Sequence, residues 1–391
     1  MSKIIPLSVP SIQGNEWKYV KECIDTGWVS SAGKFVDMFA EKFAEYLEMS
    51  RFSGSRSTRP YAVPTVNGTA ALHISLVALG LKPDEEVLVP TLTFAATANV
   101  VVYCNAYPVF MDVEEDTLGL DPQKVEEFLT QECDWKNGCL INKSTKRRVR
   151  GMIPVHLYGH PVDMPPILEF AGKYNLFIVE DATEALGSKY KGQFAGTLGQ
   201  TGAFSFNGNK IITTGGGGMV VTKDSDLAEY IKFLTTQARE GTGYYHTEIG
   251  YNYRLTNVQA ALGLAQLEKI DEFITKRRAI AHYYQQALKD VPGITVGGEA
   301  EWAWNNYWLS WILVGKDYGR SKDELLKELN RKRIEAREFF IPLHTLPPYR
   351  SYQAYQISKA LELYDKGINL PSHTTLEEDD LEIVVETIKN F

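Results

Sequence analysis

Short apolar runs alternate with longer amphipathic stretches along the first two-thirds of the chain. The apolar runs predict strands over residues 61–66, 87–90, 108–112, 151–157, 176–180, 203–206 and 219–222. Stretches with helical periodicity lie between them, over residues 70–81, 93–104 and 165–174. This alternation is typical of crossover units that build a largely parallel sheet. We therefore predict an α/β fold for this part of the chain.

Two later changes of pattern suggest an insertion and a second domain. Residues 133–150 contain Asn-Gly and end in a basic run, which favours a solvated hairpin over an anion site. Residues 255–291 predict one long helix, whole or broken, that bridges into a smaller α+β unit. Within that unit we predict a strand over 308–314, a helix over 321–332 and a Pro-rich loop over 342–348. The predicted domains are 1–254 and 255–391.

Composition excludes several classes of protein. The 391 residues carry a net charge of −8, which does not favour binding to nucleic acid or to anionic membranes. The uncharged stretch 87–111 is interrupted by prolines and asparagines, so we interpret it as core rather than as a membrane span. The four cysteines lack the paired spacing of zinc sites, and we expect no metal site. The first residues contain no apolar stretch like that of a secretory signal, so we expect a cytoplasmic protein.

An acid and an amine follow two of the predicted strands. Asp181 comes directly after strand 176–180, at a sheet edge where open α/β folds bind ligands; a helix N-cap is an equal alternative for it. Lys210 follows strand 203–206 and precedes four glycines, Gly215 to Gly218. This spacing is not a Walker loop, and the glycines lead into a strand, which also argues against a dinucleotide fingerprint. Tight backbone beside this lysine indicates a ligand packed against it.

A phosphate cradle and a flat aromatic side chain are predicted at the same edge. Strand 61–66 passes through Asn67-Gly68 into a helix, whose first amides can hold a phosphate with help from the hydroxyls of Thr69 and Ser205. The alternative for Thr69 is plain helix capping. Phe94 lies at another strand-to-helix junction and can cover a planar ring, although such a residue is more often core. An amine, an acid, a phosphate cradle and a stacking face are the four groups that pyridoxal phosphate requires.

Several long motifs, taken in order, resemble one enzyme family over nearly the whole chain. They are VNGTAAL at 66–72, PTLTFAATAN at 90–99, VHLYGHP at 155–161, VEDATEALGS at 179–188, FSFNGNKIITTGGGGM at 204–219 and GYNYRLTNVQAALGLAQL at 250–267. The chain resembles the DegT-type sugar-nucleotide aminotransferases. This resemblance implies the aspartate aminotransferase fold (pyridoxal phosphate fold type I), with a mainly parallel sheet in a large domain and a smaller α+β C-terminal domain.

The resemblance also implies roles for individual residues around pyridoxal phosphate. Lys210 would form the Schiff base, and Asp181 would pair with the pyridine nitrogen. Glu184 would lie near the ring hydroxyl, at a position where many relatives have glutamine. The remaining cofactor contacts would be phosphate binding by Thr69, Ala70 and Ser205, stacking by Phe94, and a phosphate contact from the partner subunit by Asn252. The last contact implies a homodimer with shared active sites.

Shorter sequence motifs suggest one branch of the family. GWVSSAG at 27–33 and parts of VHLYGHP and FNGNK resemble enzymes that make 4-amino-4,6-dideoxy-N-acetylglucosamine nucleotides. In the implied reaction L-glutamate leaves its amino group on the cofactor, giving 2-oxoglutarate and pyridoxamine phosphate. A nucleotide-linked 4-keto-6-deoxy sugar, favoured as the 2-acetamido form, then accepts the amino group at C4. Candidate substrate contacts, with salt bridges and packing as an equal alternative, are Trp28, Arg254, Asn306, Trp308, Arg337 and His344.

Three other functions stay open at this point. A GDP-perosamine-type aminotransferase would share every cofactor residue and would act on a sugar with a hydroxyl group at C2. A 3-dehydratase of the same fold would lack the Schiff-base lysine, so Lys210 argues against it. A regulator that binds the cofactor without catalysis is the third, although no DNA-binding helices or basic arm are seen. The sequence leaves the choice between GDP and UDP undecided.

Overall fold

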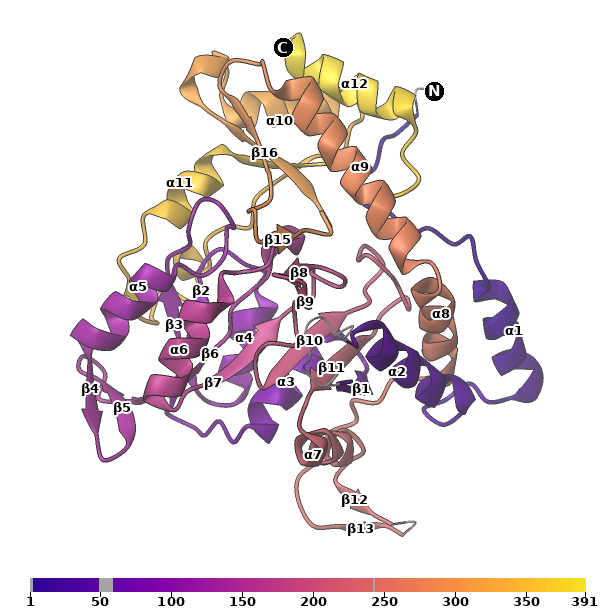
Figure 1. Ribbon diagram of the computed structural model, residues 1–391, viewed down its shortest axis with the longest axis vertical. Helices are drawn as coiled ribbons and strands as arrows, with labels where there is room; N and C mark the ends of the chain where they lie inside the picture. Colours follow the sequence, from indigo (N-terminus) through magenta and orange to yellow (C-terminus); the bar gives the residue numbers. More distant parts are fainter. Residues whose placement is uncertain (1–2, 49–58, 242) are drawn as a thin grey trace.

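A ten-stranded sheet forms the centre of the larger domain (Figure 1). The computed structural model describes residues 3–48, 59–241 and 243–391. In spatial order the strands are β1 (Tyr61–Thr65), β11 (Gly218–Thr222), β10 (Thr201–Ser205), β7 (Phe177–Asp181), β6 (Arg148–Met152), β2 (Glu86–Pro90), β3 (Tyr107–Met111) and β18 (Ala354–Tyr355). The hairpin of β4 (Cys133–Lys136) and β5 (Cys139–Asn142) extends from β6.

Strand direction in this sheet brings the ends of several strands together. The pairs from β10 through β7, β6, β2 and β3 to β18 are all parallel, whereas β11 runs antiparallel to both β10 and β1. The carboxyl ends of β1, β2, β7 and β10 therefore meet at one edge. The predicted α/β fold with a mainly parallel sheet is confirmed.

Helices cover both faces of the sheet because its strands are apolar on both sides. In β7, Phe177 and Val179 face one cluster of buried side chains, while Ile178 faces another. The first face carries α3 (Gly68–Ala78), α4 (Ala96–Tyr103) and α7 (Ser225–Thr235). The second carries α2 (Lys34–Tyr46), α5 (Pro122–Glu127) and α6 (Met164–Tyr174). Outside α2 lie α1 (Glu16–Thr26) and α8 (Asn257–Leu267), which contact each other.

The smaller domain has an antiparallel sheet of its own (Figure 1, top). Its strands, in spatial order, are β14 (Ile294–Val296), β16 (Ser310–Val314), β19 (Gly367–Leu370) and β17 (Arg337–Glu338). A separate core joins this sheet to α9 (Ile270–Leu288), α10 (Lys322–Arg331) and α12 (Glu378–Lys389). The long helix predicted over 255–291 is broken into α8 and α9 by a turn at residues 268–269. The strand predicted over 308–314 and the helix over 321–332 are confirmed as β16 and α10.

The chain returns once from the smaller domain to the large sheet. Leu343 N–H donates to the carbonyl of Thr91, and β18 then adds to the sheet beside β3. The carboxylate of Asp112, just after β3, accepts the N–H groups of Ser358 and Ala360 at the start of α11 (Lys359–Lys366). The division at residue 254 stays a prediction, and this returning segment packs with the large domain.

The sequence correctly predicts the hairpin between β4 and β5 but misplaces strand β6. The Asn-Gly hairpin is confirmed: Asn137 and Gly138 join β4 to β5 with φ of 52° and 76°. The strand predicted over 151–157 is displaced, because β6 ends at Met152. Pro154 has no N–H for the ladder, and pairing with β7 resumes only as a single bridge at Val155.

The remaining elements are short. They are β8 (Lys189–Tyr190), β9 (Gln193–Phe194) and β15 (Ala303–Trp304) in one small sheet, and β12 (Arg239–Glu240) and β13 (Tyr245–His246) in a hairpin. A short π-helix, η1 (Phe128–Glu132), and the 3-10 helices η2 (Leu157–Gly159), η3 (Lys316–Tyr318) and η4 (Leu343–Thr345) complete the set. Among the helices of the described ranges, none combines the length and the apolar character needed to cross a membrane.

Candidate active site

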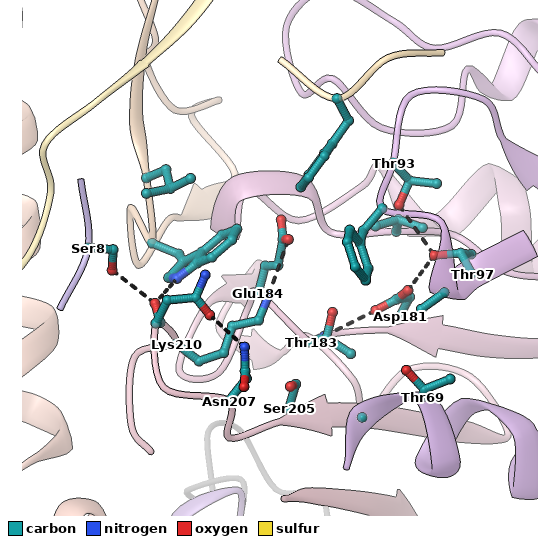
Figure 2. A pocket seen from close by; sticks show the side chains of 18 of the residues that line it. Ser8, Thr69, Thr93, Thr97, Asp181, Thr183, Glu184, Ser205, Asn207 and Lys210 are labelled. Carbon is teal, nitrogen blue, oxygen red and sulfur yellow. Dashed lines mark hydrogen bonds and ion pairs between the residues drawn. The ribbon is translucent and has the colours of Figure 1, made fainter. Parts of the chain in front are cut away.

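A cavity of about 380 Å³ opens at the edge where the parallel strands end (Figure 2). Its walls come from the turns after β1, β2, β7 and β10, and from β17 and the residues just before β16 in the smaller domain. The sequence-predicted residues that line it are Thr69, Phe94, Asp181, Glu184, Ser205, Lys210, Trp308 and Arg337. Segments far apart in the chain therefore bring the predicted amine, acid, hydroxyls and aromatic side chain into one cavity.

Lys210 is held from two sides. Its Nζ lies 3.3 Å from Glu184 Oε1 and 3.9 Å from the centre of the Trp308 ring. The preceding carbonyl, that of Asn209, accepts hydrogen bonds from the Trp308 indole N–H at 2.7 Å and from the Ser8 hydroxyl at 2.9 Å. The N-terminal segment and the smaller domain thus fix the backbone from which the lysine side chain projects.

Asp181 is the last residue of β7, and its carboxyl group is buried and oriented by two donors. Oδ2 accepts the Thr97 hydroxyl at 2.7 Å, and Oδ1 accepts the Thr183 N–H at 3.2 Å (Figure 2). Turns rather than a helix follow Asp181 in the described chain, so the alternative that it is a helix N-cap is wrong. A buried carboxylate with this fixed orientation can bind a protonated ring nitrogen.

The predicted phosphate cradle lies where β1 leads into α3. The hydroxyl-bearing residues Thr69 and Ser205 line it, and Gly68 lies so close that an added Cβ would be 2.7 Å from the Ser205 Cβ. The cap of α3 is Asn67, whose Oδ1 accepts the Ala70 N–H at 2.7 Å, so the alternative of capping by Thr69 is wrong. Ala70 itself does not contribute to the described cavity wall, and its predicted phosphate contact stays a prediction.

An aromatic wall stands above the cavity. Phe94 is 59% exposed, and its ring centre is 5.9 Å from that of Phe340. Phe340 in turn stacks on Tyr158 with ring centres 5.7 Å apart. A large aromatic side chain that is exposed inside a cavity leaves a free face on which a planar ligand can stack.

The three acids of the VEDATEALGS motif have different surroundings. Glu180 faces away from the cavity and accepts hydrogen bonds from His156 and from the N–H groups of Gly196, Leu198 and Gly199. Although burial opposes ionisation, these donors hold the pKa of Glu180 below its usual range.

Glu184 is 4% exposed, and its Oε2 accepts the Tyr158 N–H at 2.9 Å. Burial raises the pKa of Glu184, and Lys210 partly opposes this. Glu180 is therefore structural, while Asp181 and Glu184 face the cavity.

These residues fit pyridoxal phosphate. A cradle too tight for a side chain at Gly68, two hydroxyl-bearing residues, a buried acid, an amine and an open aromatic face meet around one cavity. The comparison with known proteins agrees. Residues 10–389 match the DegT/DnrJ/EryC1/StrS aminotransferase family. The chain belongs to this family.

Other members are similar over their full lengths. The GDP-perosamine synthases of Caulobacter vibrioides and Escherichia coli O157:H7 are 39% and 40% identical, with 98% and 100% of this chain and 97% and 99% of theirs covered. Among solved structures, a DegT DnrJ EryC1 StrS aminotransferase from Brucella abortus is 28% identical with a TM-score of 0.86, covering 96% of this chain and 95% of its own. DesI, crystallised in the presence of its TDP-sugar product, is also 28% identical with a TM-score of 0.86, covering 100% and 93%. The protein is a pyridoxal phosphate-dependent sugar aminotransferase with the fold that the motifs implied.

Several predicted substrate and partner residues of this DegT-family chain lie outside the described cavity wall. Trp28 is 60% exposed after α1, and the His344 ring bonds the Thr91 hydroxyl at 2.7 Å. Arg254 lines a separate open groove beside the β12–β13 hairpin, and Asn252 is exposed in the same segment. Asn306 is buried, and its amide donates to the carbonyls of Glu184 and Leu186. The hydrogen bonds of Asn306 match the packing alternative. The substrate roles of Trp28, Arg254, Asn306 and His344, and the phosphate contact of Asn252, stay predictions.

Sequence reasoning missed part of the wall. Thr97 belongs to the PTLTFAATAN motif at 90–99 and lies four residues after Thr93. In a helix this spacing brings two side chains to the same face, so the sequence could have pointed to Thr97 as a residue of the site. Ser8, Glu338, Phe340 and Asn369 line the cavity from distant parts of the chain, and nothing local in the sequence marks them.

Proposed function

We propose that this aminotransferase moves the amino group of L-glutamate to C4 of a nucleotide-linked 4-keto-6-deoxy sugar. The observation that carries the proposal is the cavity itself, in which Lys210 and Asp181 stand beside a phosphate cradle and an open aromatic face. Full-length similarity to proteins named as GDP-perosamine synthases supports a sugar nucleotide as the acceptor.

Each residue has a stated task in the proposal. When bound, pyridoxal phosphate supplies an electron-accepting ring that stabilises negative charge on the carbon bearing the amino group. Asp181 holds the proton on the ring nitrogen, and Thr97 orients the carboxylate that does so. Lys210 is the amine that would hold the cofactor aldehyde, and its nitrogen is placed to move protons to and from the reacting carbon. Thr69 and Ser205 bind the phosphate, and Phe94 covers the ring.

The preferred acceptor in the proposal is the GDP-linked 4-keto-6-deoxymannose, which has a hydroxyl group at C2. Two relatives at 39% and 40% identity, both GDP-perosamine synthases, support this choice. The 2-acetamido sugar is the second candidate, because the motif at 27–33 and parts of VHLYGHP and FNGNK resemble enzymes that use it. The motif at 27–33 lies outside the described cavity wall, and the FNGNK residues in the wall surround the proposed cofactor site, so these short motifs give the weaker support.

A homodimer with shared sites completes the proposal. In the segment after β13, Tyr251 and Tyr253 pack inward against His73, with ring centres 5.2 and 5.9 Å from it. Asn252 and Arg254 alternate with these tyrosines and are exposed. Figure 1 shows the β12–β13 hairpin extending beyond α7, and its Tyr244 is 92% exposed. These exposed side chains are available to a second copy, whose phosphate cradle Asn252 would complete.

The test is transamination by the purified protein with L-glutamate and a panel of nucleotide-linked 4-keto-6-deoxy sugars. The panel pairs GDP and UDP forms and pairs C2 hydroxyl with C2 acetamido forms. We expect a 4-amino sugar from the GDP-linked hydroxyl form, detected by mass spectrometry with equimolar 2-oxoglutarate. Faster turnover of the acetamido form would establish the second candidate. No amino transfer to any of these sugars by cofactor-loaded protein would overturn the proposal, and loss of the C3 oxygen instead would identify a dehydratase.

A further inference from the structure

The carboxyl group of Glu184 has two oxygens with different surroundings. Oε2 accepts a hydrogen bond from the Tyr158 N–H at 2.9 Å. Because the backbone N–H is the donor, this oxygen acts as the acceptor. Oε1 lies 3.3 Å from Lys210 Nζ on the cavity side. With 4% of the residue exposed, water contributes little to its solvation. The charge of this carboxyl group is therefore decided by the protein groups around it.

Lys210 is the cation that balances Glu184. Within residues 3–48, 59–241 and 243–391, the titratable side chains that face Glu184 are Lys210, Asp181 and Tyr158. Asp181 is an acid and disfavours a second negative charge nearby, and the Tyr158 phenol is buried and its pKa is raised. Removal of the Lys210 charge from Oε1 would leave a buried carboxylate beside another acid. Such a group takes up a proton rather than remain charged.

The proposed function requires this change of partner, because the Lys210 nitrogen must leave Glu184 to bond to the cofactor aldehyde. We propose that, when the Lys210 ammonium condenses with the cofactor aldehyde and one water is released, Glu184 takes the proton that the Lys210 nitrogen gives up. Glu184 then donates a hydrogen bond to the cofactor ring oxygen as a neutral carboxylic acid. No covalent bond to Glu184 forms or breaks. The inference rests on the proposed roles of Lys210 and Glu184.

The geometry assigns the proton to Oε1, because Oε2 is already the acceptor for Tyr158. A neutral acid held in this way presents an acceptor to the backbone and a donor to the cavity. A glutamine amide at this position would present the same two groups. The Glu184 carboxyl group matches that amide only as long as it carries a proton.

The experiment counts protons taken up as pyridoxal phosphate binds to the apoprotein. Titration calorimetry in two buffers that lack primary amines and differ in ionisation enthalpy gives this number near neutral pH. We expect wild-type protein to take up about one proton more than Glu184→Gln. As the pH rises through the range where that uptake occurs, the association constant of wild type divided by that of Glu184→Gln should fall about tenfold per pH unit. The matched control is Glu338→Gln, a carboxyl group of the same cavity that bonds Lys322 and Tyr364 rather than Lys210. It should keep the wild-type count.

The outcomes separate this inference from the proposed function. Equal proton counts for wild type and Glu184→Gln would overturn the inference and leave transamination untouched. The expected proton difference without amino transfer to any sugar would overturn the proposed function alone. If Glu184→Gln does not fold, infrared difference spectra of the wild-type protein on cofactor binding decide the matter. A new protonated-carboxyl band supports the inference, and its absence overturns it.

Discussion

Replacing Thr97 by valine removes one hydrogen bond from the acid at the centre of the site. Thr97 is fully buried on α4, and its hydroxyl lies 2.7 Å from Asp181 Oδ2. Valine has nearly the same shape, so the change deletes a donor without opening a cavity. A hydrogen bond to a charged group contributes about 1.5–3 kcal/mol. The longer bond from Thr183 N–H, at 3.2 Å, serves the other carboxyl oxygen and does not replace it.

If Asp181 acts mainly in the transition state, this loss lowers kcat/KM by about 10- to 150-fold. The assay is steady-state transamination with L-glutamate and the best acceptor of the panel, together with thermal unfolding to confirm that the fold is intact. Thr93→Val is the matched control, because the Thr93 hydroxyl bonds Thr97 at 3.3 Å and is one step further from the carboxylate. Its effect should be much smaller. A Thr97→Val enzyme as active as wild type would refute the argument that this hydroxyl orients Asp181.

Other variants test the remaining assignments. Lys210→Ala should abolish transamination while thermal unfolding shows an intact fold, and residual turnover near the wild-type level would contradict the Schiff-base role. Asp181→Asn should lose at least ~100-fold in kcat, because a neutral amide cannot hold the ring proton; an unchanged kcat would remove Asp181 from catalysis. Lys210→Ala and a disruptive Asn252 variant, each inactive alone, should regain activity at up to about one quarter of all sites when refolded together, as random assortment into two-fold dimers requires. Mixed dimers without activity would show that Asn252 does not serve its partner's site.

Local sequence patterns were sufficient wherever one short segment carries both the signal and the structure. The Asn-Gly pair predicted the turn between β4 and β5 because few residues other than asparagine and glycine adopt its left-handed backbone. Apolar runs predicted the buried strands because both faces of a parallel sheet are covered. Lys210 and Asp181 were found because carboxyl ends of parallel strands share one edge, so residues after two such strands must be neighbours.

The sequence by itself determined the α/β class, most strand positions, the family and the residues expected around the cofactor. Each of these depends on a pattern within one short, contiguous segment. Only the tertiary structure decided which donors hold those residues in place. Ser8 and Trp308 meet on the Asn209 carbonyl although they are 300 positions apart in the chain. The return of β18 to the large sheet, and the burial of Glu184 against Tyr158 and Lys210, are equally long-range. Contacts of this kind depend on how two domains pack, and no periodicity within a single segment encodes that packing.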